Sequence, residues 1–188
     1  MIARDQSALM ADPTDFTPTP VPVARAMAAI EPWGARVWEP ACGDGAISGQ
    51  LLRRGHQVVE TDLVPRGVGY RLNFLEAREL LAPEIVTNPP YNIAPAFIDH
   101  ALALGARRVM MLLPLGWMQA VTEPQRSLVW GGRGLVRVWV SVRRIPFLRG
   151  GWDAGNGGGP VHKYALFVWE PGFVGDPALK AFDWREWA

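Results

Sequence analysis

The sequence predicts an α/β protein with a mainly parallel, doubly wound sheet of the Rossmann-like kind and a terminal antiparallel pair of strands. Short apolar runs alternate with helical patterns between residues 36 and 113. A glycine-rich turn, Gly43-Asp44-Gly45, follows the first of these runs, as in a βα unit whose backbone approaches a ligand closely. Beyond Trp117 two further β-rich runs occur. Strands and helices that alternate at this spacing place helices on both faces of a parallel sheet.

The first elements follow from proline, glycine and the apolar pattern. Residues 12–22 are rich in proline and threonine, and we expect them to be extended because each proline also restricts the residue before it. A short helix is predicted over 23–30. Strands are then predicted over 36–40, 57–61, 84–87 and 107–113. Between the strands the pattern predicts helices over 46–54, near 76–81 and over 95–104.

The C-terminal part has a different pattern. Residues 134–143 alternate apolar and charged side chains, residues 162–169 form a second β-rich run, and the two are predicted to pair antiparallel. Between them, the glycine-rich stretch 149–160 predicts a flexible loop. The tail, residues 184–187, is expected to pack on the body. No repeat or boundary divides the sequence, so residues 1–188 are predicted to form a single domain.

Composition places the chain among globular proteins, with 49% hydrophobic and 20% charged residues and a net charge of +1. No apolar run approaches the ~18–20 residues of a membrane span, and the N-terminus lacks the apolar core of a signal peptide. Cys42 is the only cysteine, so no intrachain disulfide is expected, and no residue cluster has metal-ligand spacing. We therefore expect a protein of the bacterial or phage-infected cytoplasm, without a metal and without membrane contact.

Acidic residues around the glycine turn indicate which nucleoside cofactor would fit. Glu39 and Asp44 would repel a diphosphate and attract a cationic amino acid. Asp62 ends the second predicted strand, where a carboxylate can accept hydrogen bonds from both ribose hydroxyls. A cofactor with a ribose and an ammonium group but no phosphate is S-adenosylmethionine, which is the cofactor we expect.

Two segments carry a resemblance to a known family. Glu39-Pro40-Ala41-Cys42-Gly43-Asp44-Gly45, followed by Asn88-Pro89-Pro90-Tyr91, resembles the class I S-adenosylmethionine-dependent DNA adenine-N6 methyltransferases with the gamma order of motifs. The resemblance covers roughly residues 14 to 170. It implies a set of cofactor-binding residues: Phe16, Thr19, Glu39, Ala41, Gly43, Asp44, Gly45, Asp62, Asn73, Phe74 and Asn88.

Two segments of this set match particular segments of the family. Thr19-Pro20 matches the segment that, in the family, folds over the methionine part of the cofactor. Asn73-Phe74-Leu75 stands where the family usually has Asp-Phe-Leu. There the acid accepts from the adenine N6 of the cofactor and the phenylalanine packs on its ring. The amide oxygen of Asn73 can take the acceptor's place.

Asn88-Pro89-Pro90-Tyr91 suits methyl transfer to an exocyclic nitrogen. The lone pair of such a nitrogen is delocalised into the ring, which makes it a poor nucleophile. Two acceptors aimed at its hydrogens, the Asn88 side-chain oxygen and the Pro89 carbonyl, would draw it toward tetrahedral geometry. Pro90 stiffens the loop, and Tyr91 offers a face on which the base can stack. The predicted catalytic residues are Asn88, Pro89, Pro90 and Tyr91.

The target base in DNA must be flipped out or unpaired to reach such a site. The resemblance implies a second aromatic wall after the sixth strand, where Phe147 would stand opposite Tyr91. Residues 126–149 contain six arginines and no acidic residue, a pattern that favours contact with phosphates but that also fits a solvated face. The predicted substrate-binding residues are Tyr91, Phe147, Arg143, Arg144 and Arg149.

Other functions share the motif. Asn-Pro-Pro-Tyr also occurs in enzymes that methylate glutamine in release factors, although these usually carry an additional N-terminal helical domain. RNA adenine methyltransferases use the same amine geometry, and a non-catalytic nucleic-acid-binding subunit could retain the fold. Many relatives have a separate target-recognition domain of a hundred residues or more, for which this chain has no room. We therefore expect relaxed sequence specificity, a short site read by loops 64–72, 117–133 and 149–160, or recognition by a partner subunit.

Overall fold

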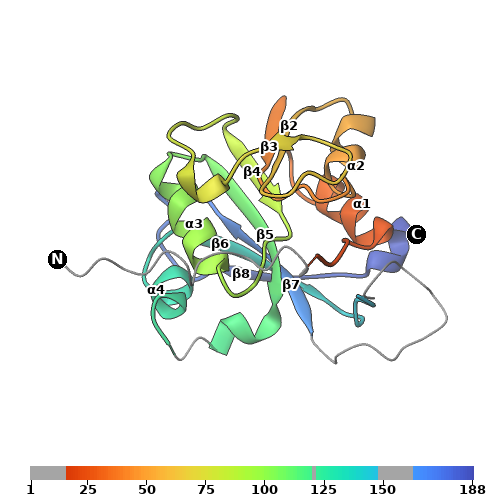
Figure 1. The fold of residues 1–188 in the computed structure, drawn as a ribbon. Helices are drawn as coiled ribbons and strands as arrows, with labels where there is room; N and C mark the ends of the chain where they lie inside the picture. The colour runs from red at the N-terminus through yellow and green to blue at the C-terminus, as the bar shows by residue number, and fades with distance from the viewer. Residues whose placement is uncertain (1–15, 120–121, 148–162) are drawn as a thin grey trace.

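The computed structural model describes residues 16–119, 122–147 and 163–188. The strands in these ranges form one sheet in the order β3-β2-β1-β4-β5-β7-β6-β8 (Figure 1). They are β1 (Arg36–Glu39), β2 (Gln57–Asp62), β3 (Tyr70–Arg71), β4 (Glu84–Thr87), β5 (Arg108–Pro114), β6 (Leu135–Ser141), β7 (Tyr164–Trp169) and β8 (Ala178–Phe182). The sheet is parallel except for β7, which runs antiparallel between β5 and β6.

Helices cover both faces of this sheet, as predicted. The α-helices are α1 (Val21–Ala29), α2 (Ser48–Arg53), α3 (Ala94–Ala103) and α4 (Gln125–Trp130). Short 3-10 helices are η2 (Phe74–Glu76), η3 (Leu115–Gln119) and η4 (Trp184–Trp187). In Figure 1, α1 and α2 lie to the right of the sheet and α3 and α4 to the left. Among the described residues, no helix is long and apolar enough to cross a membrane.

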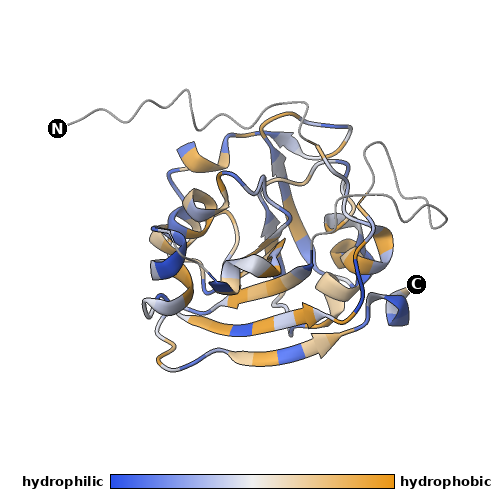
Figure 2. Cartoon of the chain, turned by 90° about the horizontal axis from the view of Figure 1, so that it is seen from below, coloured by the Kyte–Doolittle hydropathy of each residue, from blue (hydrophilic) through white to orange (hydrophobic). Residues whose placement is uncertain are grey.

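Alternation along the central strand separates two apolar layers. Val109, Met111 and Leu113 of β5 face the layer that also contains α3 and α4. Met110 and Leu112 face the layer of α1, α2 and η4. Figure 2 shows hydrophobic colour along the strands of the interior and hydrophilic colour mainly at the periphery. Because both faces of the strand are covered, the run from 109 to 113 is wholly apolar, as expected for a buried parallel strand.

The strands predicted from the sequence are confirmed, and three other expectations need correction. The expected helix near 76–81 is a single turn, η2, because the Asn73 side chain accepts from the Leu75 N–H and the chain becomes extended again at Ala77. The antiparallel pair β6–β7 is confirmed but is not terminal, since β8 adds to the outer edge of β6. Val21 and Pro22 belong to α1 rather than to the extended segment, because proline is tolerated in the first turn of a helix.

A buried ion cluster holds the amino ends of the parallel strands. The Arg137 guanidinium donates to both oxygens of Glu31, at 2.7 and 2.6 Å, and to Glu170 at 2.7 Å. Arg108 donates to Glu170 at 2.9 Å and to Glu84 at 3.3 Å. Hydrogen bonding to Glu31 raises the pKa of Arg137. Arg137 is therefore a structural residue, and it belongs neither to a phosphate-contacting face nor to a solvated one.

The tail packs on the body, as predicted. Trp184 is buried and its indole N–H donates to the Arg144 carbonyl at 3.1 Å. The Arg25 guanidinium donates to the Trp187 carbonyl at 3.0 Å, which joins η4 to α1. Figure 1 shows the C-terminus beside α1. These contacts fix the stretch that follows β6, which carries Arg143 and Arg144.

Candidate active site

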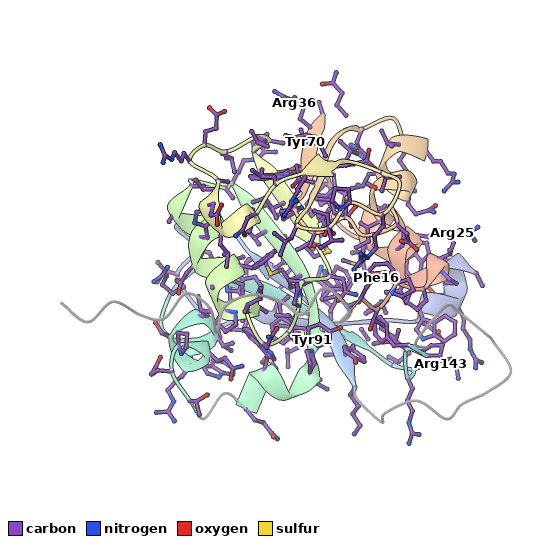
Figure 3. All side chains as sticks on the ribbon, in the orientation of Figure 1. Phe16, Arg25, Arg36, Tyr70, Tyr91 and Arg143 are labelled. Atoms are coloured by element: carbon purple, nitrogen blue, oxygen red, sulfur yellow. The ribbon has the colours of Figure 1, made fainter. Side chains whose placement is uncertain are left out.

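The predicted site residues gather at the carboxyl ends of the parallel strands. Glu39 ends β1, Asp62 ends β2, and Asn88 follows β4, the strand next to β1 in the sheet. In Figure 3, Arg36 marks the amino end of β1 at the top, whereas Tyr91 lies in the lower half of the view. The same edge therefore carries both the glycine turn and the Asn-Pro-Pro-Tyr segment, the position where open α/β sheets bind ligands.

The glycine turn adopts a backbone that favours glycine. Gly43 has φ +55° and Gly45 has φ +81°, both in the left-handed region. A Cβ atom on Gly43 would collide with the Phe16 ring, and one on Gly45 would lie 3.1 Å from Val68. The Arg66 guanidinium stands over the Phe16 ring, 4.3 Å from its centroid. Phe16 thus covers the turn, and Ala41 just before it packs against the core.

Asp62 ties the ends of β1 and β2 together. One carboxylate oxygen accepts from the Gly43 N–H at 2.8 Å, and the other accepts from the Val64 N–H at 2.8 Å. Each oxygen retains a second lone pair for a further donor, because a carboxylate offers about four acceptor sites. The side chain is half-buried. Its position and remaining acceptors fit the ribose role that the sequence predicts for it.

The two other carboxylates near the turn differ from each other. Glu39 is 1% exposed and accepts from the Ser48 N–H at 2.7 Å. Burial raises the pKa of Glu39 well above its usual value, and the Ser48 N–H opposes that rise. Glu39 therefore holds the first turn of α2. Asp44 is exposed, with an oxygen 3.2 Å from the Ala46 N–H, so it is the carboxylate that faces solvent beside the turn.

Asn73 and Phe74 are adjacent in the sequence but lie in different environments. The Asn73 side chain is half-buried, accepting from Leu75 and donating to Glu76 at 2.9 Å. Phe74 is 2% exposed and packs edge-on against Trp38 with ring centroids 5.1 Å apart. It is a core residue in this structure, and the contact of its ring with a cofactor stays a prediction.

Asn88 is held at both ends of its amide. Its Nδ2 donates to the Thr19 hydroxyl at 3.2 Å, which brings the threonine-proline segment onto the loop after β4. Its Oδ1 accepts from the Tyr91 hydroxyl at 3.1 Å. Pro89 is buried and Pro90 half-buried, so the backbone between these groups is confined. The predicted catalytic segment thus presents a fixed amide beside the glycine turn.

Tyr164, the first residue of β7, is a site residue that the sequence analysis missed. Its ring lies 5.8 Å from the Tyr91 ring and 4.7 Å from the Phe147 ring, centroid to centroid. The wall predicted from Tyr91 and Phe147 therefore contains a third ring, which contacts both. Only the pairing of β7 with β5 beside the loop after β4 places Tyr164 there, and a tyrosine in a β-rich run gives no sign of it.

The remaining predicted contacts lie after β6. Arg143 is 49% exposed and donates to Asp183 at 2.6 Å, and this hydrogen bond lowers the pKa of Asp183. Arg144 is exposed. Figure 3 shows Arg143 at the lower right, on the side of the molecule where Tyr91 lies. Arg149 and the loop 149–160 lie outside the described residues.

Cys42 is a buried thiol, and the described ranges contain no cluster of metal-binding side chains. Cys42 is buried, and burial raises the pKa of its thiol to about 12, so it remains a thiol at neutral pH. Within residues 16–119, 122–147 and 163–188, no group of three or more histidine, cysteine or acidic side chains could hold a metal ion.

The fold is similar to that of solved methyltransferases. A type I restriction-modification methyltransferase subunit from Streptococcus thermophilus matches with a TM-score of 0.60 at 14% identity, covering 89% of this chain and 48% of that one. A predicted O-methyltransferase from Agrobacterium tumefaciens matches with a TM-score of 0.57 at 15% identity, covering 85% and 86%. This chain thus spans about half the length of the first protein and most of the second.

A third similar structure contains a bound nucleoside product. It is a Burkholderia thailandensis 1,6-didemethyltoxoflavin-N1-methyltransferase with 1,6-didemethyltoxoflavin and S-adenosylhomocysteine, with a TM-score of 0.51 at 16% identity, covering 80% of this chain and 77% of that one. The sequence matches no protein-family model and no curated protein. At these identities the structural likeness establishes the fold, which is that of the class I S-adenosylmethionine-dependent methyltransferases, as the sequence predicted.

Proposed function

We propose that this chain is an S-adenosylmethionine-dependent methyltransferase that methylates the exocyclic N6 amine of adenine in DNA. The observation that carries the proposal is the placement of Asn88. Its amide is held between Thr19 and Tyr91 at the end of β4, and β4 is the neighbour of the strand that ends in the glycine turn. The resemblance of both segments to DNA adenine-N6 methyltransferases supports adenine in DNA as the target.

The residues at the turn fit the proposed cofactor. Gly43 and Gly45 leave backbone where a side chain would collide, and Asp62 offers acceptors for ribose hydroxyls. Asp44 offers a solvent-facing carboxylate for an ammonium group. Residues 39–52 contain no arginine or lysine that would favour a diphosphate, and the nearby Arg66 guanidinium stands over the Phe16 ring. When bound, the cofactor supplies an electrophilic methyl group on a sulfonium ion.

Asn88 would make the amine nucleophilic. The amide oxygen can accept one N–H of the amine through its second lone pair, while the Pro89 carbonyl accepts the other. Both acceptors bias the nitrogen toward tetrahedral geometry, so that its lone pair is released from the ring and directed at the methyl group. Because the loop holds these acceptors in advance, little reorganisation is needed at the moment of transfer. The methylated nitrogen then loses its extra proton to solvent.

Asp62→Asn is expected to weaken cofactor binding about tenfold, the equivalent of one charge-assisted hydrogen bond. The amide can accept on one side only, so either the Gly43 N–H or the Val64 N–H loses its partner. Calorimetric titration with S-adenosylmethionine measures the effect, and Asp99→Asn on α3 is the control. An unaltered dissociation constant in Asp62→Asn would mean that this carboxylate does not bind the ribose.

The logarithm of DNA affinity falls as the logarithm of salt concentration rises. Arg144→Ala is expected to make this negative slope shallower by about one, as for the loss of one phosphate contact. Arg143→Ala should change the slope less, since Asp183 already neutralises that guanidinium. Fluorescence anisotropy of a labelled duplex across a salt series measures both slopes. Arg133→Ala, whose side chain pairs with Asp99, serves as the control. Identical slopes in Arg144→Ala and wild type would remove Arg144 from the DNA interface.

Transfer of labelled methyl to different polymers tests the substrate. Duplex DNA, single-stranded DNA, RNA and a release-factor protein are incubated in parallel with the enzyme and labelled cofactor. The proposal predicts label in DNA, recovered as N6-methyladenine after digestion to nucleosides. Label confined to RNA or to the protein would move the assignment to the corresponding enzyme class, and cofactor binding without any transfer would favour a non-catalytic subunit.

A further inference from the structure

Two hydroxyl-bearing side chains outside the Asn-Pro-Pro-Tyr segment contact it from distant parts of the sequence. We propose that Thr19 and Tyr164 are positioning residues for the proposed methyl transfer, Thr19 by binding the Asn88 amide directly and Tyr164 by holding Tyr91 against it. The proposal rests on the proposed function and deepens it, because it assigns what fixes the orientation of the amide that activates the amine.

Thr19 is placed to fix the nitrogen end of the amide. It lies just before α1, is 7% exposed, and its Oγ1 accepts from Asn88 Nδ2 at 3.2 Å across 69 residues of sequence. The terminal torsion of an asparagine side chain is broad and roughly two-fold, so the amide needs a partner to hold one orientation. With Nδ2 engaged by Thr19, the oxygen end faces away from the N-terminal segment and toward Tyr91.

Tyr164 is placed to fix Tyr91. It is 7% exposed, its ring lies 5.8 Å from the Tyr91 ring, and its far side contacts Phe147 at 4.7 Å. The Tyr91 side chain also hydrogen-bonds to it, and burial raises the pKa of Tyr164. Held in this way, Tyr91 keeps its hydroxyl 3.1 Å from Asn88 Oδ1. A chain of hydrogen bonds thus runs from Thr19 through Asn88 and Tyr91 to Tyr164.

This series of hydrogen bonds leaves one acceptor of Asn88 for the substrate. Tyr91 uses one lone pair of Asn88 Oδ1, and the second remains for an N–H of the amine. If the amide turned over, Nδ2 would face the amine and two donors would meet. A hydroxyl can donate as well as accept, so the oxygen orientation is selected when Tyr164 donates to Tyr91, which leaves the single Tyr91 proton for Asn88 Oδ1 and leaves Nδ2 for Thr19. The acceptor is then fixed before the base arrives, and little reorganisation is needed during transfer.

Two conservative variants test the proposal. Thr19→Val and Tyr164→Phe each remove one hydroxyl without changing side-chain shape, and each should lower kcat roughly 2- to 10-fold, the range for a neutral hydrogen bond. Thr19→Ser should restore the rate. The controls are Thr87→Val and Tyr70→Phe. The Thr87 hydroxyl is buried with no hydrogen-bond partner among the described residues, and Tyr70 is 52% exposed on β3.

The decisive comparison is made in the Asn88→Ala background. Residues that act only through the Asn88 amide lose their effect when it is absent, so Thr19→Val and Tyr164→Phe should then cause no further loss of kcat. The same fold-loss in both backgrounds would show a general structural role and overturn the proposal. Wild-type rates in Thr19→Val and Tyr164→Phe would overturn it equally.

A measurement without turnover separates this proposal from the proposed function. The side-chain amide protons of Asn88 are assigned in the NMR spectrum by their absence in Asn88→Ala, and their exchange with solvent is followed. Exchange should be roughly 2- to 10-fold faster in Thr19→Val, and it should be unchanged in Thr87→Val. Equal exchange in Thr19→Val and wild type would overturn the contact itself. If the contact holds while wild type transfers no methyl to any polymer, the proposed function fails and the positioning role fails with it.

Discussion

Asn88→Ala is expected to lower the rate of methyl transfer by ~100–1,000-fold, or ~2.7–4 kcal/mol, by analogy with the loss of one oxyanion-hole donor. The amide oxygen would act on the amine most strongly in the transition state, where positive charge develops on the nitrogen. Its removal should therefore lower kcat and leave cofactor affinity nearly unchanged. Single-turnover transfer from labelled cofactor to DNA measures the effect.

Asn92→Ala is the matched control for that variant. Asn92 lies four positions further along the same loop, and its side chain is exposed. Its replacement should leave the transfer rate close to that of wild type. Near-normal transfer by Asn88→Ala would show that the amide does not activate the amine, and an equal loss in both variants would show a general disturbance of the loop.

Arg137→Met is expected to lower the free energy of unfolding by about 3 kcal/mol, the lower end of the range for removing one partner of a buried ion pair. Glu31, 2% exposed, would lose two hydrogen bonds and keep Trp139 at 2.8 Å as a close donor. The lower end applies because Arg137 is itself 19% exposed. Urea unfolding followed by tryptophan fluorescence measures the change.

A double variant separates the charge from the shape of Arg137. Glu31→Gln combined with Arg137→Met leaves no buried carboxylate without a partner, so it should recover at least about 1 kcal/mol relative to Arg137→Met alone. Arg133→Met, whose partner Asp99 is 44% exposed, should have little effect on stability. A loss under about 1 kcal/mol in Arg137→Met would mean that the cluster does not hold the strand ends.

The regular part of the fold could be predicted because its signals are local. Residues 85–86 and 109–113 are apolar and lie between proline or glycine residues, and both are in strands whose side chains alternate between the two helix layers. The glycine turn was visible because Gly43 and Gly45 adopt conformations that few other residues tolerate. Local sequence therefore predicted the strands, and the order of motifs predicted the edge where they meet.

Other features depend on contacts between distant residues. Arg137 pairs with Glu31, which lies 106 residues earlier in the sequence. An arginine in an alternating strand gives no local sign of such a buried partner. Strand β8 was missed because 178–182 is largely exposed and follows a proline-rich turn, so it lacks a core pattern. Tyr164 joins the site only because β7 inserts antiparallel next to β5. In each case tertiary pairing, rather than propensity, decides the role.

The most direct test of the proposed function is the nucleoside analysis of duplex DNA after incubation with S-adenosylmethionine and either wild-type protein or Asn88→Ala. The account predicts N6-methyladenine from the wild-type reaction, and ~100–1,000-fold less from Asn88→Ala at equal cofactor binding. Absence of N6-methyladenine from the wild-type reaction, or equal amounts from the two proteins, would contradict it.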